Sequence, residues 1–517
     1  MSKVNSLKAY WLVAAVALAV TGRAYALPPS DYNSTPGDTL DVFVSGSSAQ
    51  DPGLELLVRV LCDADTLDIY RDLDPSKSSQ RVFFCKASAA KVPGFPAAGQ
   101  KVAIFKTSVG GSGNGVGPVI RTSDPASMLK FIDMNFLKSQ DPVTGGCSTN
   151  TLIPASGIFG AYENHEGCPT STTQSQLPDA GVSDVEPALF VSIFTPPLAG
   201  AELNTLTVKS ASAVIFGVPV TQALRDALQQ VQLGPACVGK ETELCMPSLT
   251  RDQLNSIYTG TLTDWGQMEV KGTATPLPAA PGVSPPSDTK VYVVRRVDTS
   301  GTQVSFNVFY SGTLCGIKGA RSFLVDNSGG VCTQPPTGTV FAGSKTGDAR
   351  TCLNTHNTNN RWAVGILSTE SVFNKDPNGN PLPTPDGWRF IKVDDQAPTL
   401  FKTATSHYPF FSEQSIQWRN ATSPMPLTGL KLKLMTTVAT KLGQPPIVAK
   451  LNTIFVQSFG GAGLLSLSTN GYTVPDPLTA AALKITPVNP MTKVPTGTKP
   501  VNCQPPVLAT GRKTVTP

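Results

Sequence analysis

The sequence predicts an α/β protein, because two stretches pass from a strand-like apolar run through a polar turn into a helix-like pattern. The first begins at Thr39 and the second at Val291, and a third strand-like run begins at Lys101. Short β-branched or alternating runs are typical of strands, and apolar residues three or four apart are typical of helices. With 517 residues, 40% hydrophobic and 15% charged, the chain can form two domains or more.

The stretch Val291–Phe309 contains the strongest candidate for an anion site. Its polar residues are, in order, Arg295, Arg296, Asp298, Thr299, Ser300, Gly301 and Thr302. Hydroxyls, a glycine and the free N–H groups at the start of a helix suit an anion. Arg296 adds a planar fork of donors, and we expect Asp298 to hold that fork in place. The alternative is a capped helix after an exposed pair of arginines.

Three other turns are rich in small polar residues. The strand-like run Thr39–Ser45 leads into a Gly-Ser-Ser turn and then a helix that Asp51 caps. The run Lys101–Lys106 leads into a glycine-rich loop, which is able to wrap an oxyanion or to serve as a flexible surface loop. The third turn places Ser183 beside Asp184, a pair that is usually a turn cap.

The N-terminus has the pattern of a signal peptide. Lys3 and Lys8 precede an apolar run from Trp11 to Val20, and small residues then predict cleavage after Ala26. The apolar run is too short to span a bilayer, no later segment reaches about 18 uninterrupted apolar residues, and no cysteine follows the cleavage site to take a lipid. We therefore expect a soluble product that is periplasmic or secreted.

Charge and cysteine content narrow the function further. The predicted signal peptide holds three of the 41 basic residues and no acidic one, which leaves 38 basic against 36 acidic residues. This balance excludes a nucleic-acid partner. The ten cysteines suit five disulfides, and the simplest pairs are Cys62 with Cys85, Cys147 with Cys168, and Cys237 with Cys245. No cysteine pair has zinc-site spacing and only three histidines exist, so we expect no metal and no cofactor.

Composition also indicates how the chain is divided. The segments Asp141–Gln176 and Ser311–Thr355 are rich in small residues and cysteine, and we expect both to be insertions held by disulfides. We expect an amphipathic helix over Ala126–Leu137. The strand-like run Ala211–Val220 is interrupted by glycine and proline, which suits a crossing between domains. A Pro/Thr-rich tail ends the chain.

In order and wording, these pieces resemble the periplasmic phosphate-binding proteins of ABC transporters, which have the type 2 periplasmic-binding fold. The resemblance extends from Thr39 to about Pro426, and Arg-x-Asp-x-Ser-Gly-Thr at 296–302 is its most specific motif. The other pieces are Gly46-Ser47-Ser48, the glycine loop at Ser112, Gly181-Val182-Ser183-Asp184, Val214–Leu228, Leu254–Gly260 with Asp264-Trp265, Trp362–Leu367 and Tyr408-Pro409.

The resemblance implies two α/β lobes joined by two hinge-strand crossings. One lobe would combine residues 27–212 with 396–517, the other would be 213–395, and inorganic phosphate would bind in the cleft between them. Carried over position by position, the ligand-binding residues are Ser48, Ala49, Ser112, Asp184, Arg296, Ser300, Gly301 and Thr302. An ABC permease is the partner that the resemblance implies. Since a carboxylate can only accept hydrogen bonds, Asp184 would favour an anion that still carries a proton over fully ionised sulfate.

Some features depart from that family. Ala49 and Gln50 replace an aromatic-proline pair, Thr299 stands where glycine is usual, and ten cysteines with two long insertions are atypical. An insertion near the cleft could cover it or block docking on a permease.

Two other classes of function remain. An extracellular structural or adhesive protein built on this fold would fit the disulfides and the tail. A secreted phosphatase could use Ser300 or Ser183 with His407 and Asp298, but no Gly-x-Ser-x-Gly elbow lies near these residues. We therefore expect a binding protein and not an enzyme.

Overall fold

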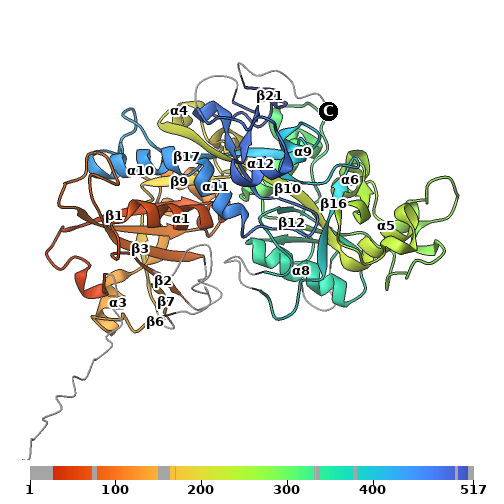
Figure 1. Ribbon diagram of the computed structural model, residues 1–517, viewed down its shortest axis with the longest axis horizontal. Helices are drawn as coiled ribbons and strands as arrows, with labels where there is room; N and C mark the ends of the chain where they lie inside the picture. The colour runs from red at the N-terminus through yellow and green to blue at the C-terminus, as the bar shows by residue number, and fades with distance from the viewer. Residues whose placement is uncertain are drawn as a thin grey trace, which may run out of the picture.

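The computed structural model describes residues 27–72, 79–149, 164–168, 171–330, 332, 338–375, 381–494 and 499–509. The predicted signal peptide and its cleavage site lie outside these residues. The described chain is a mixed α/β structure with two lobes that lie side by side (Figure 1). No helix among the described residues has both the length and the apolar character needed to cross a membrane.

The first lobe is built on a sheet with parallel strands at its centre. Strand β1 (Thr39–Gly46) pairs in parallel with β4 (Gln100–Thr107) and with β9 (Ala180–Ser183), and β3 (Gln80–Ala87) pairs with β4 in the antiparallel sense. Residues alternate between the faces of a strand. Val42 and Val44 therefore pack in the core under α1 (Asp51–Leu61) and α10 (Gly429–Lys441), and Phe43 packs in a cluster on the other face.

The sheet of this lobe continues to its outer edge. Strand β2 (Asp68–Asp72) pairs with β3, and β7 (Asn164–Cys168) pairs with β2. The stretch 126–137 is not the single helix that we expected. It contains a short 3-10 turn, the strand β5 (Leu129–Ile132) and the start of α3 (Met134–Gln140), because Asp133 accepts hydrogen bonds from Asn135 N and Phe136 N and so starts the helix later.

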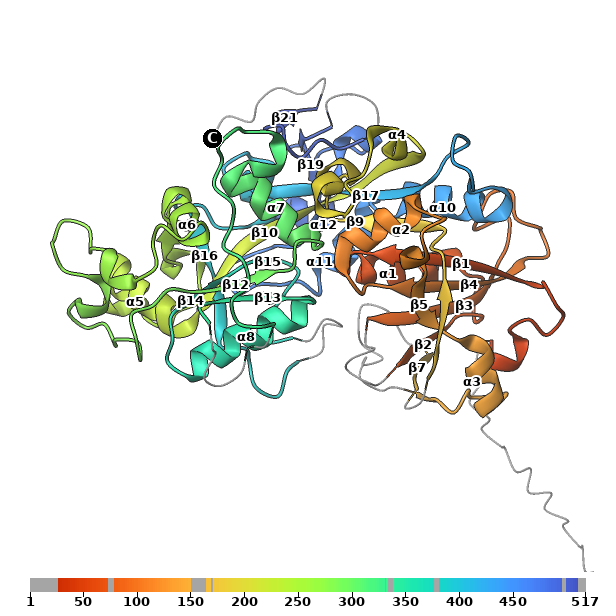
Figure 2. The same ribbon diagram turned by 180° about the vertical axis from the view of Figure 1, so that it is seen from behind.

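The second lobe is a sheet between two layers of helices. Strand β12 (Tyr292–Arg296) pairs in parallel with β13 (Val340–Gly343) and β14 (Ala363–Gly365). Helices α5 (Gln222–Leu233) and α6 (Arg251–Tyr258) pack on one face of it, and α8 (Thr346–Thr358) packs on the other (Figures 1 and 2). The segment Ser311–Thr355, which we expected to be an insertion, thus supplies β13 and most of α8 to the lobe itself.

One long strand joins the two sheets. The first part of β10 (Leu206–Thr221) pairs with β17 (Phe411–Arg419), and its last part pairs with β14 and with β16 (Trp388–Val393). The chain returns from β16 to β17 through α9 (Leu400–Ala404). The domain boundaries that we place near residues 212 and 395 fall inside β10 and shortly after β16, and they stay predictions.

Five disulfides join all ten cysteines. Cys62–Cys85, Cys147–Cys168 and Cys237–Cys245 confirm the three predicted neighbour pairs. Cys332–Cys352 lies within the second lobe, whereas Cys315 pairs with Cys503, which is 188 residues away in the C-terminal segment. No local spacing predicts that last pair.

A buried histidine makes the stability of the second lobe dependent on pH. His356 on α8 is 2% exposed beside the ring of Tyr292, and burial together with the charge of Arg361 lowers its pKa to about 4. The unfolded state binds a proton on His356 more tightly than the folded state does. The contribution of the neutral, buried His356 to the free energy of unfolding is therefore complete above about pH 6.5, and it is lost as the pH falls toward 4. We expect the wild type to lose about 3 kcal/mol more over this range than H356N, as measured by urea unfolding. H407Q, at an exposed site, should behave as wild type, and equal losses in all three proteins would contradict the prediction.

Candidate functional site

A small cavity lies where loops of the two lobes meet. Its volume is about 210 Å³, with the open solvent at its mouth included. The residues that line it are Ser47, Ser48, Ala49, Gly111, Ser112, Asp184, Arg296, Ser300, Gly301, Thr302 and Thr346. All eight predicted ligand-binding residues are among them, and the structure therefore brings together side chains from four separate turns.

The turn after β1 is held by a lysine that is fully buried. Lys106 Nζ donates to the carbonyl oxygen of Gly46 at 3.1 Å, donates to Ser108 Oγ at 2.7 Å, and pairs with Asp51 at 3.0 Å. Burial lowers the pKa of Lys106, and the neighbouring charge of Asp51 opposes that shift. The lysine thereby joins the turn that carries Ser48 to the first residue of α1.

Glycines allow the loops of the first lobe to approach each other closely. A Cβ atom on Gly181 would lie 1.7 Å from the carbonyl oxygen of Gly115, and a Cβ atom on Gly46 would lie 2.0 Å from that of Val182. Neither distance is possible for a real side chain, so both positions require glycine. This close packing places Ser112, in the glycine loop, against Asp184, whose backbone N–H donates to Ser112 Oγ at 3.1 Å.

Asp184 is a buried carboxylate with several donors around it. Its Oδ1 accepts from Ser47 Oγ at 2.6 Å and from Gln414 Nε2 at 3.2 Å, and Ser112 Oγ is 3.4 Å from its Oδ2. Burial raises the pKa of Asp184, whereas these hydrogen bonds and the charge of Arg296 lower it. Sequence reasoning did not assign Ser47 or Gln414 to the site. Ser47 stands within the Gly-Ser-Ser motif and could have been found, but Gln414 lies on β17 and has no motif.

Arg296 faces the cavity from the second lobe. Its Nε donates to the carbonyl oxygen of Gly343 at 3.0 Å, its Nη2 to that of Ser344 at 3.0 Å, and its Nη1 to Thr346 Oγ1 at 2.9 Å. Burial lowers the pKa of Arg296 to about 10, and the charge of Asp184 opposes the shift. The guanidinium therefore stays charged at neutral pH.

Asp298 does not orient Arg296, which corrects our expectation. It pairs with Arg295, and 67% of its side chain is exposed. Neighbouring residues on a strand point to opposite faces, so Arg295 and Arg296 cannot share one carboxylate easily. The loop before α8 holds Arg296 instead.

The two lobes touch at the cavity. Gly113 N donates to the carbonyl oxygen of Thr299 at 2.8 Å, which is a hydrogen bond between the glycine loop and the turn before α7 (Gly301–Phe306). A Cβ atom on Gly301 would lie 2.3 Å from Ser112 Oγ. Ser112, Asp184 and Arg296 are only 1–3% exposed, so the charged groups of the cavity are buried where the lobes meet.

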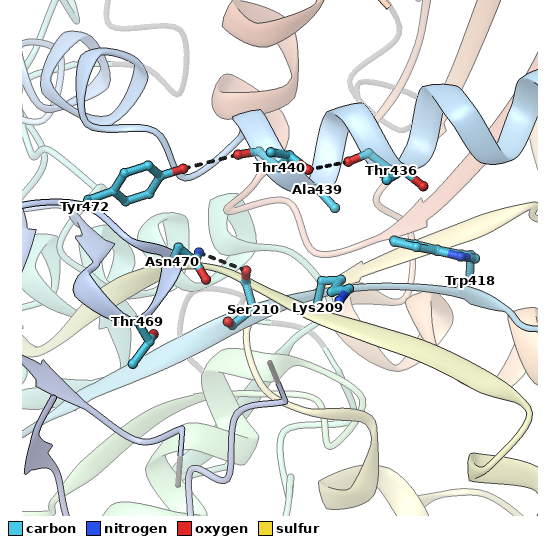
Figure 3. A pocket seen from close by; sticks show the side chains of 9 residues that line it. All are labelled: Lys209, Ser210, Trp418, Thr436, Ala439, Thr440, Thr469, Asn470 and Tyr472. Atoms are coloured by element: carbon cyan, nitrogen blue, oxygen red, sulfur yellow. Dashed lines mark hydrogen bonds between the residues drawn. The ribbon is translucent and has the colours of Figure 1, made fainter. Parts of the chain in front are cut away.

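A larger cavity lies elsewhere on the first lobe, between α10 and the strands β10 and β17 (Figure 3). Its volume is about 680 Å³, again with the open solvent at its mouth included. Lys209 is the one charged residue among those that line it. Tyr472 Oη at its edge donates to the carbonyl oxygen of Thr440 at 3.2 Å. Because it lacks a guanidinium, a carboxylate and contact with the second lobe, it does not match the anion site that the sequence predicts.

One group of side chains resembles a set of metal ligands, but two of its members form a disulfide. Cys332, Cys352 and His356 lie together, with ligand atoms within 4.8 Å of one another. The two sulfur atoms form a disulfide and are not available as thiolates.

No protein-family model matches the sequence, and no curated protein is significantly similar to it. Several solved structures align with most of this chain. One is a putative phosphate ABC transporter substrate-binding protein with bound phosphate from Clostridium perfringens, with a TM-score of 0.38, 14% identity, and coverage of 80% of this chain and 97% of that one. An ABC-type phosphate transport receptor from Vibrio cholerae has a TM-score of 0.34, 17% identity, and coverage of 78% and 96%. A high-affinity periplasmic phosphate-binding protein has a TM-score of 0.36, 11% identity, and coverage of 87% and 99%.

Lys106 offers a test of how the site is supported. We expect K106M to lower the free energy of unfolding by about 3 kcal/mol or more, because it leaves Asp51 and the carbonyl oxygen of Gly46 buried with fewer partners. K101M is the matched control on the same strand. Lys101 pairs with Asp38 where both side chains are 25% exposed, so its loss should cost about 1 kcal/mol or less. Urea unfolding of the two variants measures the difference, and equal losses would contradict this account.

Proposed function

We propose that this protein is an exported binding protein that captures inorganic phosphate, as hydrogen phosphate, between its two lobes. The observation that supports this most is the composition of the closed cavity. It combines one guanidinium, several hydroxyls and one carboxylate, contributed by both lobes. The predicted signal peptide supports export.

The cavity has enough free donors for an oxyanion. A guanidinium has five N–H groups, and Arg296 uses three of them on the protein, which leaves two for a ligand. The hydroxyls of Ser48, Ser300 and Thr302 line the same space. A buried anion is tolerated only when donors surround it, and each charge-assisted hydrogen bond contributes about 1.5–3 kcal/mol.

Asp184 supports hydrogen phosphate over other oxyanions. Its Oδ1 already accepts two hydrogen bonds from the protein, whereas its Oδ2 has only the long contact with Ser112 Oγ. Oδ2 is therefore the atom that accepts the proton of the ligand. Fully ionised sulfate has no proton to donate and would place its charge against the carboxylate.

A phosphatase is less well supported. Within the described residues, no histidine lines the cavity. His407 is exposed and contacts Thr405, and Ser183 Oγ accepts from the backbone N–H of Val185. Ser300 therefore has no histidine base beside it. Uptake through an ABC permease is the transport role that this proposal includes, and an extracellular structural role is the alternative.

Asp184 gives the sharpest test of the ligand. We expect the wild type to bind phosphate about 100-fold more tightly than sulfate, since like charges placed together cost several kcal/mol. D184N should reduce that ratio to about tenfold or less, because an amide can donate to sulfate. Isothermal titration calorimetry with both anions measures the ratio. Equal affinities of the wild type for the two anions would refute the proposal.

The neighbouring arginines provide a second test with a built-in control. R296K should weaken phosphate binding by about 10-fold to 100-fold, because lysine keeps the charge but loses the planar fork. Arg295 donates to the carbonyl oxygens of Leu324 and Arg296 and to Asp298, and it does not line the cavity, so R295K should stay within about threefold of wild type. Calorimetry compares them, and similar losses in both variants would argue against a specific role for Arg296.

A further inference from the structure

We infer that this protein retains its oxyanion for a long time, because the C-terminal segment straps the two lobes together beside the closed site. The inference rests on the proposed function and adds a property to it, which is slow exchange of the ligand. It follows from how Asn502 and Cys503, two consecutive residues, are attached to different lobes.

Ligand exchange requires the lobes to separate. Nine of the eleven residues that line the cavity are buried, Ser48 and Thr346 are half-buried, and the hydrogen bond from Gly113 N to the carbonyl oxygen of Thr299 joins the two lobes at its wall. Helix α7 and the glycine loop are too close for even a Cβ atom on Gly301. Separation of the lobes would break this contact and widen the mouth of the cavity, so we expect ligand exchange to depend on it.

Asn502 attaches the strap to the first lobe. Its backbone N–H donates to Glu186 Oε1 at 2.8 Å and its Nδ2 donates to Glu186 Oε2 at 2.5 Å. Its Oδ1 accepts from the backbone N–H of Glu413, on β17, at 2.9 Å. Asn502 is 2% exposed, and Glu186 follows Asp184 of the site by two residues. This end of the strap is a buried polar contact immediately beside the cavity.

A second contact holds the preceding part of the segment. Thr492 Oγ1 donates to Glu413 Oε1 at 2.8 Å, and Lys493 Nζ donates to the carbonyl oxygen of Phe411 at 2.7 Å. Lys493 is 6% exposed and Glu413 is fully buried. The C-terminal segment is thus attached to β17 at two places.

Cys503 attaches the strap to the second lobe. It forms a disulfide with Cys315, which follows α7 and its π-helical extension, and the Cα atoms are 5.5 Å apart. Adjacent residues have Cα atoms about 3.8 Å apart, so the link from the Asn502 contact to the disulfide has almost no slack. The C-terminal strand β21 (Val507–Leu508) follows, pairs with β20 (Met491–Thr492), and lies above α7 in the view of Figure 2.

An apolar cluster lies under the strap and crosses between the lobes. Val304, Val308 and Leu314 of the second lobe pack in one cluster with residues of the first lobe, and Cys503 packs against it. The first-lobe members include Val116, Val185 and Leu189. Opening would expose this apolar surface to water in addition to breaking the hydrogen bonds of Asn502.

The strap acts on entry and exit alike. A free hinge opens without breaking covalent or buried polar links, whereas here the Asn502 contacts must break or the disulfide must be strained. The same barrier slows association and dissociation, so the equilibrium affinity changes little. A partner that collects the anion quickly would first have to displace Asn502 from Glu186.

The test compares exchange rates in the full-length mature protein. Radiolabelled phosphate is bound and then chased with unlabelled phosphate, in the wild type and in the double variant C315S/C503S. We expect phosphate to dissociate and to associate about tenfold faster or more in the variant, because one restraint on opening has been lost. The dissociation constant of the variant should stay within about threefold of the wild-type value. The double variant C237S/C245S removes a disulfide inside the second lobe and should exchange as wild type does.

A second variant covers the case in which the cysteine variant does not fold. N502A keeps the disulfide but removes the side-chain contacts with Glu186 and Glu413, and it should accelerate exchange in the same direction. Wild-type exchange rates in N502A and in any folded C315S/C503S would overturn the inference.

Failure of the proposed function gives a different result. If the wild type shows no phosphate binding at equilibrium, the proposed function fails and the strap is tested by small-angle X-ray scattering without ligand. A strapped protein keeps one compact radius of gyration, and C315S/C503S or N502A gives a larger one. Equal radii in all three proteins would then overturn the strap itself.

Discussion

The hydrogen bond between Gly113 of the first lobe and Thr299 of the second is the contact on which the site depends. Each lobe alone presents only part of a donor set, and neither part can surround an anion. This contact brings the turn that begins at Ser300 against the glycine loop, where a Cβ atom on Gly301 would lie 2.3 Å from Ser112 Oγ and one on Gly113 would lie 3.0 Å from the Cβ atom of Thr299. The closed cavity is therefore a consequence of backbone packing.

Closure also explains the charges in the cavity. Arg296 and Asp184 are both buried, and burial shifts the pKa of each toward its neutral form, downward for the arginine and upward for the aspartate. Each charge opposes the shift of the other. Under the proposed function, an anion that carries a proton would suit both groups at once, because its oxygens would accept from the guanidinium and its proton would be donated to the carboxylate. Burial of the pair is thus the feature on which the proposed selectivity rests.

The sequence predicted the loops of the site better than their supports. Ser48, Ser112 and Ser300 follow strand ends within short motifs, and the resemblance of those motifs to a known family was what assigned Ser48 and Ser112 to the predicted site. Arg296 is held by Gly343, Ser344 and Thr346 instead of by Asp298, and Asp184 is held by Gln414 from a strand 230 residues away. These contacts depend on which strands become neighbours, and a single sequence carries no local signal for that. The same reason hid the pair Cys315–Cys503, whereas three of the four shorter disulfides were predicted from spacing.

Delivery and retention of an anion place opposite demands on the hinge. Delivery to a membrane partner needs lobes that open quickly about the strands that cross between them. In this chain such opening is opposed by a covalent link from Cys503 to the second lobe, one residue after the Asn502 contact with the first. The C-terminal segment and the long-range disulfide lie beside the site, so they restrain the movement that exposes the ligand. Under the proposed function, such a restraint favours retention of the anion over its rapid transfer to a permease.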